Sequence, residues 1–442
     1  MISTLPVYTL TEWQTIILPG LLLTAADRPL AASLVGGDAG RLEIEELREG
    51  LHIRALSWVG VVRFHNFEVR IVPKLAGGQA GLVQMVALTS GLSALRRNRG
   101  QRCLAIAENA HLFDLLALLF AEACERILQG GLLHDYVERE TDLPVLRGRL
   151  LVDQQLRHHY GRVDRLACRY DDHLSDIVEN QILAAALSVC RSRVNQPSVR
   201  LHIHRLHTLF TAVCSTNGLA DWKSVRATVH YHRLNNHYRE AHELAWLLLD
   251  NIGIDDLLAS GQTRSFAFLL DMNQLFERFI VYFFRYALAK ESYQIQPQKR
   301  DRSIIWDLLQ QRPYTHITPD ILIQGRNGRR LVVDAKYKLY DERRLSTADI
   351  YQSFLYAYAY SDAHSVPPAA LLLYPASKKE ARSVYLQIRG QTQIIRADLQ
   401  ALAIPIPQAL AEIDNNVIGP ASAALAEVIA QSIGRDELLD TP

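Results

Sequence analysis

Residues 317–338, ITPDILIQGRNGRRLVVDAKYK, decide the fold of the C-terminal part of the chain. Segments 317–324 and 330–338 are apolar and rich in β-branched residues, a composition that favours strands. The residues between them, Gly325-Arg326-Asn327-Gly328, are typical turn formers. The stretch therefore predicts a β-hairpin.

The length of the turn decides which hairpin side chains share a face. A three-residue loop that ends with Gly328 in the left-handed conformation of a G1 bulge places Asp320 directly opposite Asp334, with Cβ atoms about 4.5–5.5 Å apart. Lys336 and Lys338 follow on the same face because side chains alternate along a strand. A two-residue Asn-Gly loop would move Asp320 to the other face. We favour the bulged loop because it brings these charged groups together.

Two carboxylates at this distance repel each other unless a cation lies between them. Mg²⁺, which takes oxygen ligands at about 2.0–2.1 Å, suits Asp320, Asp334 and the backbone carbonyl of Ala335, with Mn²⁺ as the alternative. Lys336 would orient the attacking water or help to deprotonate it, and this set of groups can hydrolyse a phosphodiester. An isolated D-x-K is also common in surface hairpins with a simple Lys–Asp pair. Pro319-Asp320 at a matched spacing favours the site.

Composition limits the class of protein. A chain of 442 residues has room for two or three domains, and 49% hydrophobic with 21% charged residues is typical of a globular protein. A net charge of +1 argues against a wholly basic coat for nucleic acid, although local basic patches fit it. Glu12 interrupts the N-terminal apolar run, which predicts no secretory signal. The longest apolar stretch, 112–123, is too short to span a bilayer.

The five cysteines have no CxxC spacing and predict buried free thiols in a reducing, cytoplasmic compartment. An arginine cluster at Arg96, Arg97, Arg99 and Arg102 has two interpretations, phosphate contact or a solvated loop.

Changes in pattern predict an α+β and α/β multidomain protein. Residues 1–76 are β-rich, with two strands in 56–75 joined at His65-Asn66, and would form a partner-docking module. Residues 77–262 predict a mainly helical linking and docking domain. Its helical apolar spacing covers 82–95, 112–129, 177–193, 204–213 and 239–253.

Residues 263–400 predict an ordered αβββαβ series, followed by a helical tail at 401–442. The series consists of a helix at 269–290, a strand at 292–296 or 304–309, the hairpin, a helix at 348–360 that opens with the capping box Ser346–Asp349, and strands at 370–374 and 384–389. Glu277 stands at the border of the apolar face of the first helix. It is either an edge residue or a third contact to metal or water. Gln352 and Tyr356 lie one turn apart on the second helix.

These pieces together resemble the PD-(D/E)xK nuclease core, and Gln352 with Tyr356 is similar to the QxxxY element of its RecB-like branch. More narrowly, the chain resembles the McrC family, the nuclease subunits of McrBC-type 5-methylcytosine restriction systems. The matching segments are DMNQLFERF (271–279), TPDILI (318–323), VVDAKYK (332–338), DIYQ (349–352), WVGVVRFHNFEVRIVPKL (58–75), RGRL (147–150), DIVENQIL (176–183) and HYREAHELAWLLL (237–249).

The resemblance implies that 263–400 is a nuclease domain in which Asp320 and Asp334 hold the metal, Lys336 serves the hydrolytic water, and Glu277 and Gln352 flank the site. It also implies a McrB-like AAA+ GTPase partner that forms hexameric rings and recognises methylated double-stranded DNA. The N-terminal half would dock on the rings and stimulate GTP hydrolysis. The chain has no GxxxxGK[ST] motif, which agrees with a motor supplied by the partner.

Two other functions remain open. The chain could be a non-catalytic activator of an AAA+ ring, against which the intact acidic pair argues. It could also be a free-standing RecB-like DNA-processing nuclease, against which the long segment before the nuclease core argues.

Overall fold

The computed structural model describes residues 5–36, 40–90, 112–162, 164–215, 222–251, 265–361, 367–376, 383–389 and 395–433. The chain forms a mixed α/β protein with several sheets, divided into two compact units. The first unit contains residues 1–109 and 264–442, and the second contains residues 110–263. The units do not coincide with the four predicted segments, because the N-terminal module and the C-terminal region share one unit. The Arg96–Arg102 cluster lies outside the described residues.

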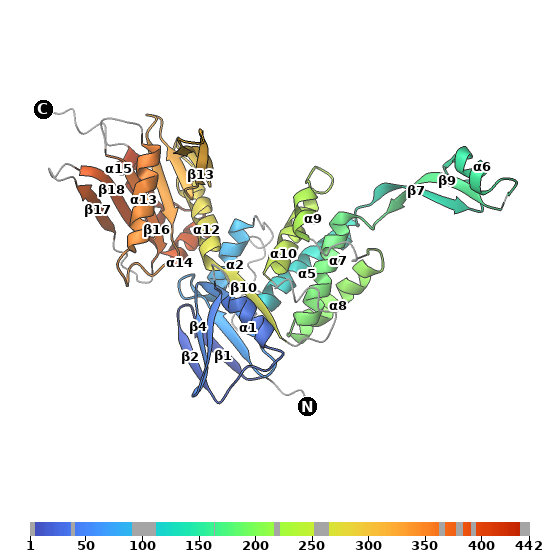
Figure 1. The fold of residues 1–442 in the computed structure, drawn as a ribbon, viewed down its shortest axis with the longest axis horizontal. Helices are drawn as coiled ribbons and strands as arrows, with labels where there is room; N and C mark the ends of the chain where they lie inside the picture. Colours follow the sequence, from blue (N-terminus) through green and yellow to red (C-terminus); the bar gives the residue numbers. More distant parts are fainter. Residues whose placement is uncertain are drawn as a thin grey trace. The chain divides into compact units, whose positions relative to one another are not determined.

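The N-terminal module contains two small sheets around one apolar core, as its β-rich pattern predicts (Figure 1). Its elements are β1 (Val7–Thr11), β2 (Thr15–Pro19), α1 (Arg28–Val35), β3 (Leu42–Leu47), β4 (Gly50–Ala55), β5 (Trp58–Arg63) and β6 (Glu68–Val72). The predicted pair of strands in 56–75 is confirmed, because β5 and β6 pair antiparallel on either side of His65-Asn66.

A strand from the distant C-terminal region completes this module. β10 (Phe266–Asp271) pairs antiparallel with β5, and Leu269 lies opposite Gly60. Gly60 has φ +150°, and a Cβ there would lie 2.0 Å from the carbonyl oxygen of Phe268, so the close approach of the two strands requires glycine. This pairing joins the N-terminal module to the C-terminal region.

The same strand corrects the predicted start of the following helix at residue 269. Helix α12 begins only at Met272 and runs to Ala287, because residues 269–271 are hydrogen-bonded to β5 as a strand. The Asp271 carboxylate accepts a hydrogen bond from the backbone N–H of Asn273 and caps the helix. Phe276, Phe279 and Phe283 are buried, as predicted for the core side.

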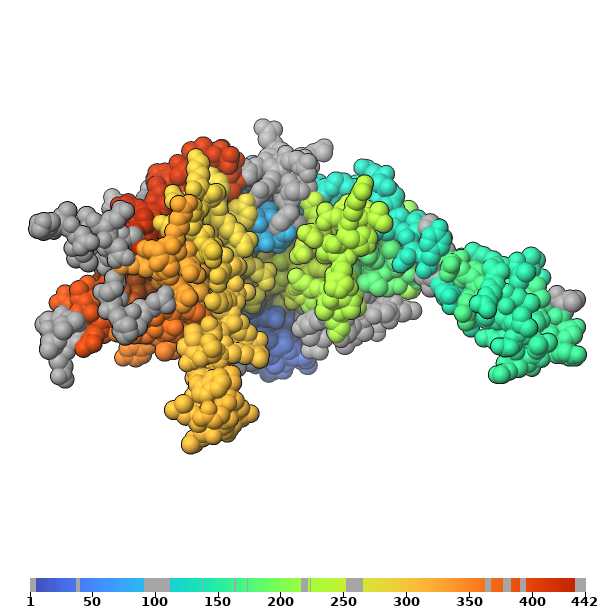
Figure 2. Space-filling view, turned by 90° about the horizontal axis from the view of Figure 1, so that it is seen from above, coloured from blue at the N-terminus to red at the C-terminus, as the bar shows by residue number. Residues whose placement is uncertain are grey.

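A six-stranded mixed sheet forms the centre of the C-terminal region, in the order β11-β14-β15-β16-β18-β17. After α12, its strands and their covering helix are β11 (Gln294–Pro297), β14 (Ile321–Gln324), β15 (Arg330–Ala335), α13 (Thr347–Tyr360), β16 (Ala369–Pro375), β17 (Val384–Arg389) and β18 (Ile395–Ile404). These elements follow the predicted order. Both candidate first strands form: β11 joins the sheet, whereas β12 (Asp301–Asp307) pairs with β13 (Arg312–Ile317) in a separate hairpin that projects from the unit (Figure 2).

The predicted helical tail at 401–442 is wrong in its first residues. Residues 401–404 are the end of β18, a buried strand between β16 and β17. Half of its residues are alanine or leucine, and its position between two strands overrides that weak helical preference. Helices α14 (Ile406–Asn415) and α15 (Pro420–Ile433) then form within the tail as predicted.

The second unit contains all but the first of the helices predicted in the middle region, together with a β-arm that the sequence pattern did not predict. The elements of the middle region are α2 (Gly78–Thr89), which belongs to the first unit, then α5 (Leu112–Gly130), α7 (Val178–Arg193), α8 (Pro197–Thr211), α9 (Trp222–Thr228), η1 (Asn236–Tyr238) and α10 (Arg239–Asp250). The arm consists of β7 (Asp135–Leu143), β8 (Arg149–Leu150), α6 (Val152–His158) and β9 (Leu166–Leu174). It extends away from the helices of its unit (Figure 1). Its strands carry many charged residues and lack a clear apolar face, so they give little strand signal.

Four of the predicted buried thiols are confirmed: Cys124, Cys168, Cys190 and Cys214 are buried and free. Cys103 lies outside the described residues. Within the described part of the chain, no helix is both long and apolar enough to cross a membrane.

Candidate active site

The hairpin of β14 and β15 has the predicted bulged loop. Ile321 lies opposite Val333 and Gln324 opposite Arg330. Extended by one residue beyond β14, this register sets Asp320 opposite Asp334, in agreement with the electrostatic interaction between the two carboxyl groups. The Gly325 N–H donates to the Arg329 carbonyl at 2.9 Å, and Gly328 has φ +79°, as a G1 bulge requires. The alternative two-residue loop is therefore excluded.

The hairpin brings Asp320, Asp334 and Lys336 together. The Ala335 N–H donates a hydrogen bond of 2.7 Å to Oδ2 of Asp320, which fixes this carboxylate against the end of β15. The Lys336 ammonium lies 3.0 Å from Oδ1 of Asp334, to which it donates a hydrogen bond, and 2.9 Å from Oδ2. One ammonium group therefore lies beside a pair of carboxyl groups, where β14 begins and β15 ends in the interior of the sheet.

Burial shifts the protonation of these groups. Burial, together with the negative charge of Asp334, raises the pKa of Asp320 to about 7. Burial also raises the pKa of Asp334, although the Lys336 ammonium offsets part of the effect. For Lys336 itself burial favours the neutral form, but the contacts with Asp334 and Asp320 outweigh it, so its pKa is raised. The Lys336 ammonium therefore stays charged. The two carboxyl groups repel each other when both are ionised, unless a further cation lies between them.

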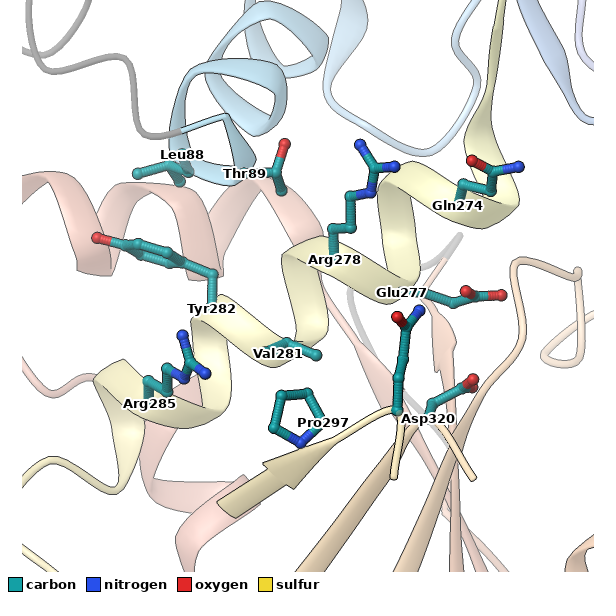
Figure 3. Close-up of a pocket in the computed structure, with 11 residues that line it drawn as sticks. Leu88, Thr89, Gln274, Glu277, Arg278, Val281, Tyr282, Arg285, Pro297 and Asp320 are labelled. Carbon is teal, nitrogen blue, oxygen red and sulfur yellow. The ribbon is translucent and has the colours of Figure 1, made fainter. Parts of the chain in front are cut away.

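Glu277 adds a third carboxyl group from helix α12. Its side chain and that of Asp320 line one end of the same pocket, as Figure 3 shows. Burial raises the pKa of Glu277, and Lys336 acts against that shift, which places the carboxyl within electrostatic range of the hairpin groups. Glu277 therefore faces the site, and its contact to metal or water stays a prediction.

The donor set fits a divalent cation held by few protein ligands. Within the described ranges, no group of three or more His, Cys, Asp or Glu side chains is arranged to hold a metal ion. The carboxylate oxygens of Asp320 and Asp334 and the backbone carbonyl oxygen of Ala335 would be the ligands of such a cation. Oδ2 of Asp334 is buried and, among the described residues, contacts the Lys336 ammonium at 2.9 Å without accepting a hydrogen bond, so it retains lone pairs for a cation.

Gln352 is not brought into contact with the carboxyl groups. It lies on α13, and its Nε2 donates to the Tyr356 hydroxyl at 3.0 Å. Its role at the site stays a prediction.

Asp349, at the start of α13, interacts electrostatically with Asp334, unlike Gln352. The sequence did not predict this role. The predicted capping bond forms, because Oγ of Ser346 accepts from the Asp349 N–H at 3.2 Å. The Asp349 carboxylate instead accepts from Lys338 Nζ at 2.7 Å and from the Tyr340 hydroxyl, and its charge raises the pKa of Asp334. The DIYQ segment was the only sequence signal at this position.

Tyr337, between the two lysines, ties the site to the N-terminal module. Its hydroxyl donates to the Glu12 carboxylate at 3.0 Å, and its ring lies 5.6 Å from Trp13 and 5.7 Å from Phe276, between ring centroids. Glu12 also accepts from the Lys74 N–H at 2.7 Å. A lone glutamate in an apolar N-terminal run gives no signal of this contact.

Comparison with known proteins adds a family to this geometry. The family model of the McrBC 5-methylcytosine restriction system component matches residues 53–375, more than half of the chain. A search of curated protein sequences finds no match. Two solved structures from Thermococcus gammatolerans are similar, and each identity is low enough that the likeness concerns fold alone.

The first is a chain of the refined half-complex from a tetradecameric assembly of McrB AAA+ hexamers with bound McrC. It is 18% identical, covers 96% of this chain and 100% of that chain, and has a TM-score of 0.61. The second is a chain of the McrBC complex determined by cryo-electron microscopy, with 21% identity, coverage of 64% and 88%, and a TM-score of 0.48. From the match to the family model, the chain belongs to the family of McrBC 5-methylcytosine restriction system components.

Proposed function

We propose that the chain is the metal-dependent DNA endonuclease subunit of a modification-dependent restriction system and has a PD-(D/E)xK-type core. It would hydrolyse phosphodiesters of methylated double-stranded DNA when assembled with a hexameric McrB-like AAA+ GTPase, whose GTP hydrolysis it stimulates. The observation that carries the proposal is the hairpin register, which sets Asp320 against Asp334 and Lys336. Membership of the McrBC component family and the likeness to a chain of a complex of McrB hexamers with bound McrC support it.

Each residue of the site has a chemical task in this reaction. Asp320, Asp334 and the Ala335 carbonyl would hold Mg²⁺, or Mn²⁺ as the alternative. When bound, the cation supplies Lewis-acid polarisation of the phosphoryl oxygen and lowers the pKa of water. Lys336 stays protonated beside Asp334 and donates hydrogen bonds to the attacking water or to the developing charge on the phosphoryl oxygens.

Glu277 and Gln352 would flank this centre from two helices. Burial raises the pKa of Glu277, and its carboxyl group would accept a proton or position water at the site. Gln352, held by the Tyr356 hydroxyl, would contact the substrate from α13.

Replacing either of two groups tests the assignment. Asp334→Ala and Lys336→Ala should each lower DNA cleavage by the assembled complex at least about a hundredfold, because each removes a preorganised charge from the transition state. Cleavage of methylated DNA with partner, GTP and Mg²⁺ is the measurement. Lys290→Ala, an exposed lysine at the far end of the α12 region, is the control and should cut like the wild type.

Stimulated GTP hydrolysis by the same complexes reports assembly, and both site variants should retain it. Wild-type cleavage by either variant would show that the nuclease assignment is wrong. If neither the wild type nor the variants cut while GTP hydrolysis is still stimulated, the chain is a non-catalytic activator. Cutting by the isolated chain with Mg²⁺ and no nucleotide would identify a free-standing nuclease.

A further inference from the structure

A groove of about 570 Å³ runs along helix α12 away from the catalytic carboxyl groups. One wall is the exposed side of α12, which includes Arg278, Tyr282 and Arg285. The end of α2, at Thr89, and the end of β11, at Pro297, supply the other walls (Figure 3). Since Glu277 and Asp320 lie at one end of the groove, any chain bound in it would lead directly to the site.

The sequence of α12 places its arginines on the groove side. Arg278 and Arg285 are seven residues apart, which is two helical turns, so they share a face about 10.5 Å apart along the axis. Phe279 and Phe283 are buried on the core side of the helix. Both guanidinium groups are therefore directed along one exposed stripe, as Figure 3 shows.

These two arginines form no hydrogen-bonded or ion pair within the part of the chain that the structure describes, although Arg278 lies within electrostatic range of Glu277. Arginines elsewhere on the described surface commonly do form such pairs, for example Arg54 with Glu43 and Arg226 with Asp250. The planar fork of a guanidinium matches the geometry of phosphate oxygens. Two guanidinium groups in one groove, neither bonded to another described residue, therefore favour a phosphate-bearing ligand.

We propose that this groove binds the sugar–phosphate backbone of one DNA strand and guides it to the catalytic carboxyl groups. The proposal rests on the proposed function and names a binding surface for its substrate. The two arginines, about 10.5 Å apart along the helix axis, meet different phosphates of the same strand. Arg278, beside the site, holds a phosphate near the scissile bond, and Arg285 holds one further along the strand. Both are positioning residues.

Photocrosslinking tests whether DNA enters the groove. Tyr282→p-azidophenylalanine, within the groove, is compared with Tyr385→p-azidophenylalanine, an exposed tyrosine on β17 at the opposite edge of the sheet from β11. Each is placed in a chain that also carries Asp334→Ala, assembled with the partner, GTP and methylated duplex. Crosslinked DNA from position 282 and none from position 385 is the expected result. Absence of crosslinks at 282, or equal yields at both positions, would overturn the proposal.

Cleavage kinetics test the arginines themselves. Arg278→Gln with Arg285→Gln should raise the KM for DNA roughly tenfold per arginine at about 0.1 M salt, and should lower the salt dependence of log KM by about two units in slope. Arg285→Gln alone should raise the KM about tenfold and lower the salt dependence of log KM by about one unit in slope. Its kcat should be unaltered, because Arg285 lies far from Glu277. The control, Arg389→Gln with Arg396→Gln, removes two exposed arginines from β17 and β18 and should leave KM unchanged.

Different results would overturn the binding groove and the nuclease assignment. Wild-type KM and salt dependence in the Arg278/Arg285 double variant, with cutting still abolished by Asp334→Ala, would overturn the groove and leave the nuclease assignment intact. Cutting by the Asp334→Ala complex would overturn the nuclease assignment, whatever the crosslinks show.

Discussion

Glu68 and His242 show two ways in which a buried ionisable residue is stabilised in this protein. Glu68 is almost fully buried and forms ion pairs with Arg63 at 2.6 Å and with Arg70 at 3.0 Å. His242, on α10, is fully buried and forms no ion pair among the described residues. Its Nε2 must donate to the Glu179 carbonyl at 2.9 Å, and its Nδ1 then accepts from the Tyr231 hydroxyl at 3.0 Å. Both bonds fit the neutral ring.

Protonation of His242 should therefore destabilise the second unit. Burial lowers its pKa to about 4 from 6.5, so the folded protein resists a proton that the unfolded chain binds below pH 6.5. The stabilisation is complete above pH 6.5 and is lost as the pH falls towards 4, by up to about 3 kcal/mol. Urea unfolding between pH 7.5 and 4.5 measures it. His242→Gln should flatten this dependence, and an unchanged slope in that variant would contradict the assignment.

At the scale of elements, the loop between β14 and β15 sets the register on which the site depends. A shift of one residue would move Asp320 to the other face of the sheet. Asn327 supports the loop through a hydrogen bond from its Nδ2 to the Ile433 carbonyl of α15, and its Oδ1 accepts from the Arg329 N–H. The loop is thus fixed by its own turn chemistry and by a contact with the C-terminal helix.

Gly328→Ala tests the backbone requirement of this loop. A Cβ at Gly328 would meet no atom within 4 Å, so the cost comes only from its φ of +79° and should be about 1–2 kcal/mol in urea unfolding. Gly130→Ala is the matched control, because that glycine ends α5 with equally open space and no positive φ. The control should be neutral or slightly stabilising. Equal losses in both variants would contradict the bulged loop.

At the scale of the whole molecule, the first unit is discontinuous in sequence but shares its packing. β10 adds to the N-terminal sheet through β5, and Leu269 belongs to the core of that module. The Tyr337 hydroxyl contact with Glu12 joins the strand end that carries the site to the same module. A partner that binds the N-terminal module is therefore connected to the candidate active site through packed residues.

Fragments should reflect this organisation. Residues 264–442 expressed alone should lack a cooperative unfolding transition. In this fragment β10 would lose its only partner strand among the described residues, and the ring of Tyr337 would lose its contact with Trp13. Residues 110–263 should unfold cooperatively, since they form a compact unit with buried helices of their own. Urea unfolding followed by near-ultraviolet circular dichroism compares the two fragments. A cooperative transition in the first fragment would show that the N-terminal module is not required.

Local patterns in the sequence were sufficient for the hairpin and the helices. The turn formers at 325–328, between two apolar and β-branched segments, predicted the hairpin. The choice of the loop that brings the charged groups together predicted the register, and hence Asp320 opposite Asp334. Helical spacing predicted α5, α7, α10 and α12 to within three residues at each end, whereas α8 begins at Pro197, seven residues before the predicted start at 204. These features depend on residues close in sequence, so the pattern alone contains the information.

The tertiary structure decided what joins distant segments. Glu12 and Tyr337 are 325 positions apart, β10 pairs with β5, and β18 lies between two strands despite a sequence that favours helix. The lining of the α12 groove comes from four separate segments, at 88–89, 274–285, 297–298 and 320. The sequence by itself determined the hairpin of the candidate site, because turn geometry and side-chain alternation act over a few residues. Only the fold determined what surrounds it, because burial and pairing between distant segments leave no local signature in the chain.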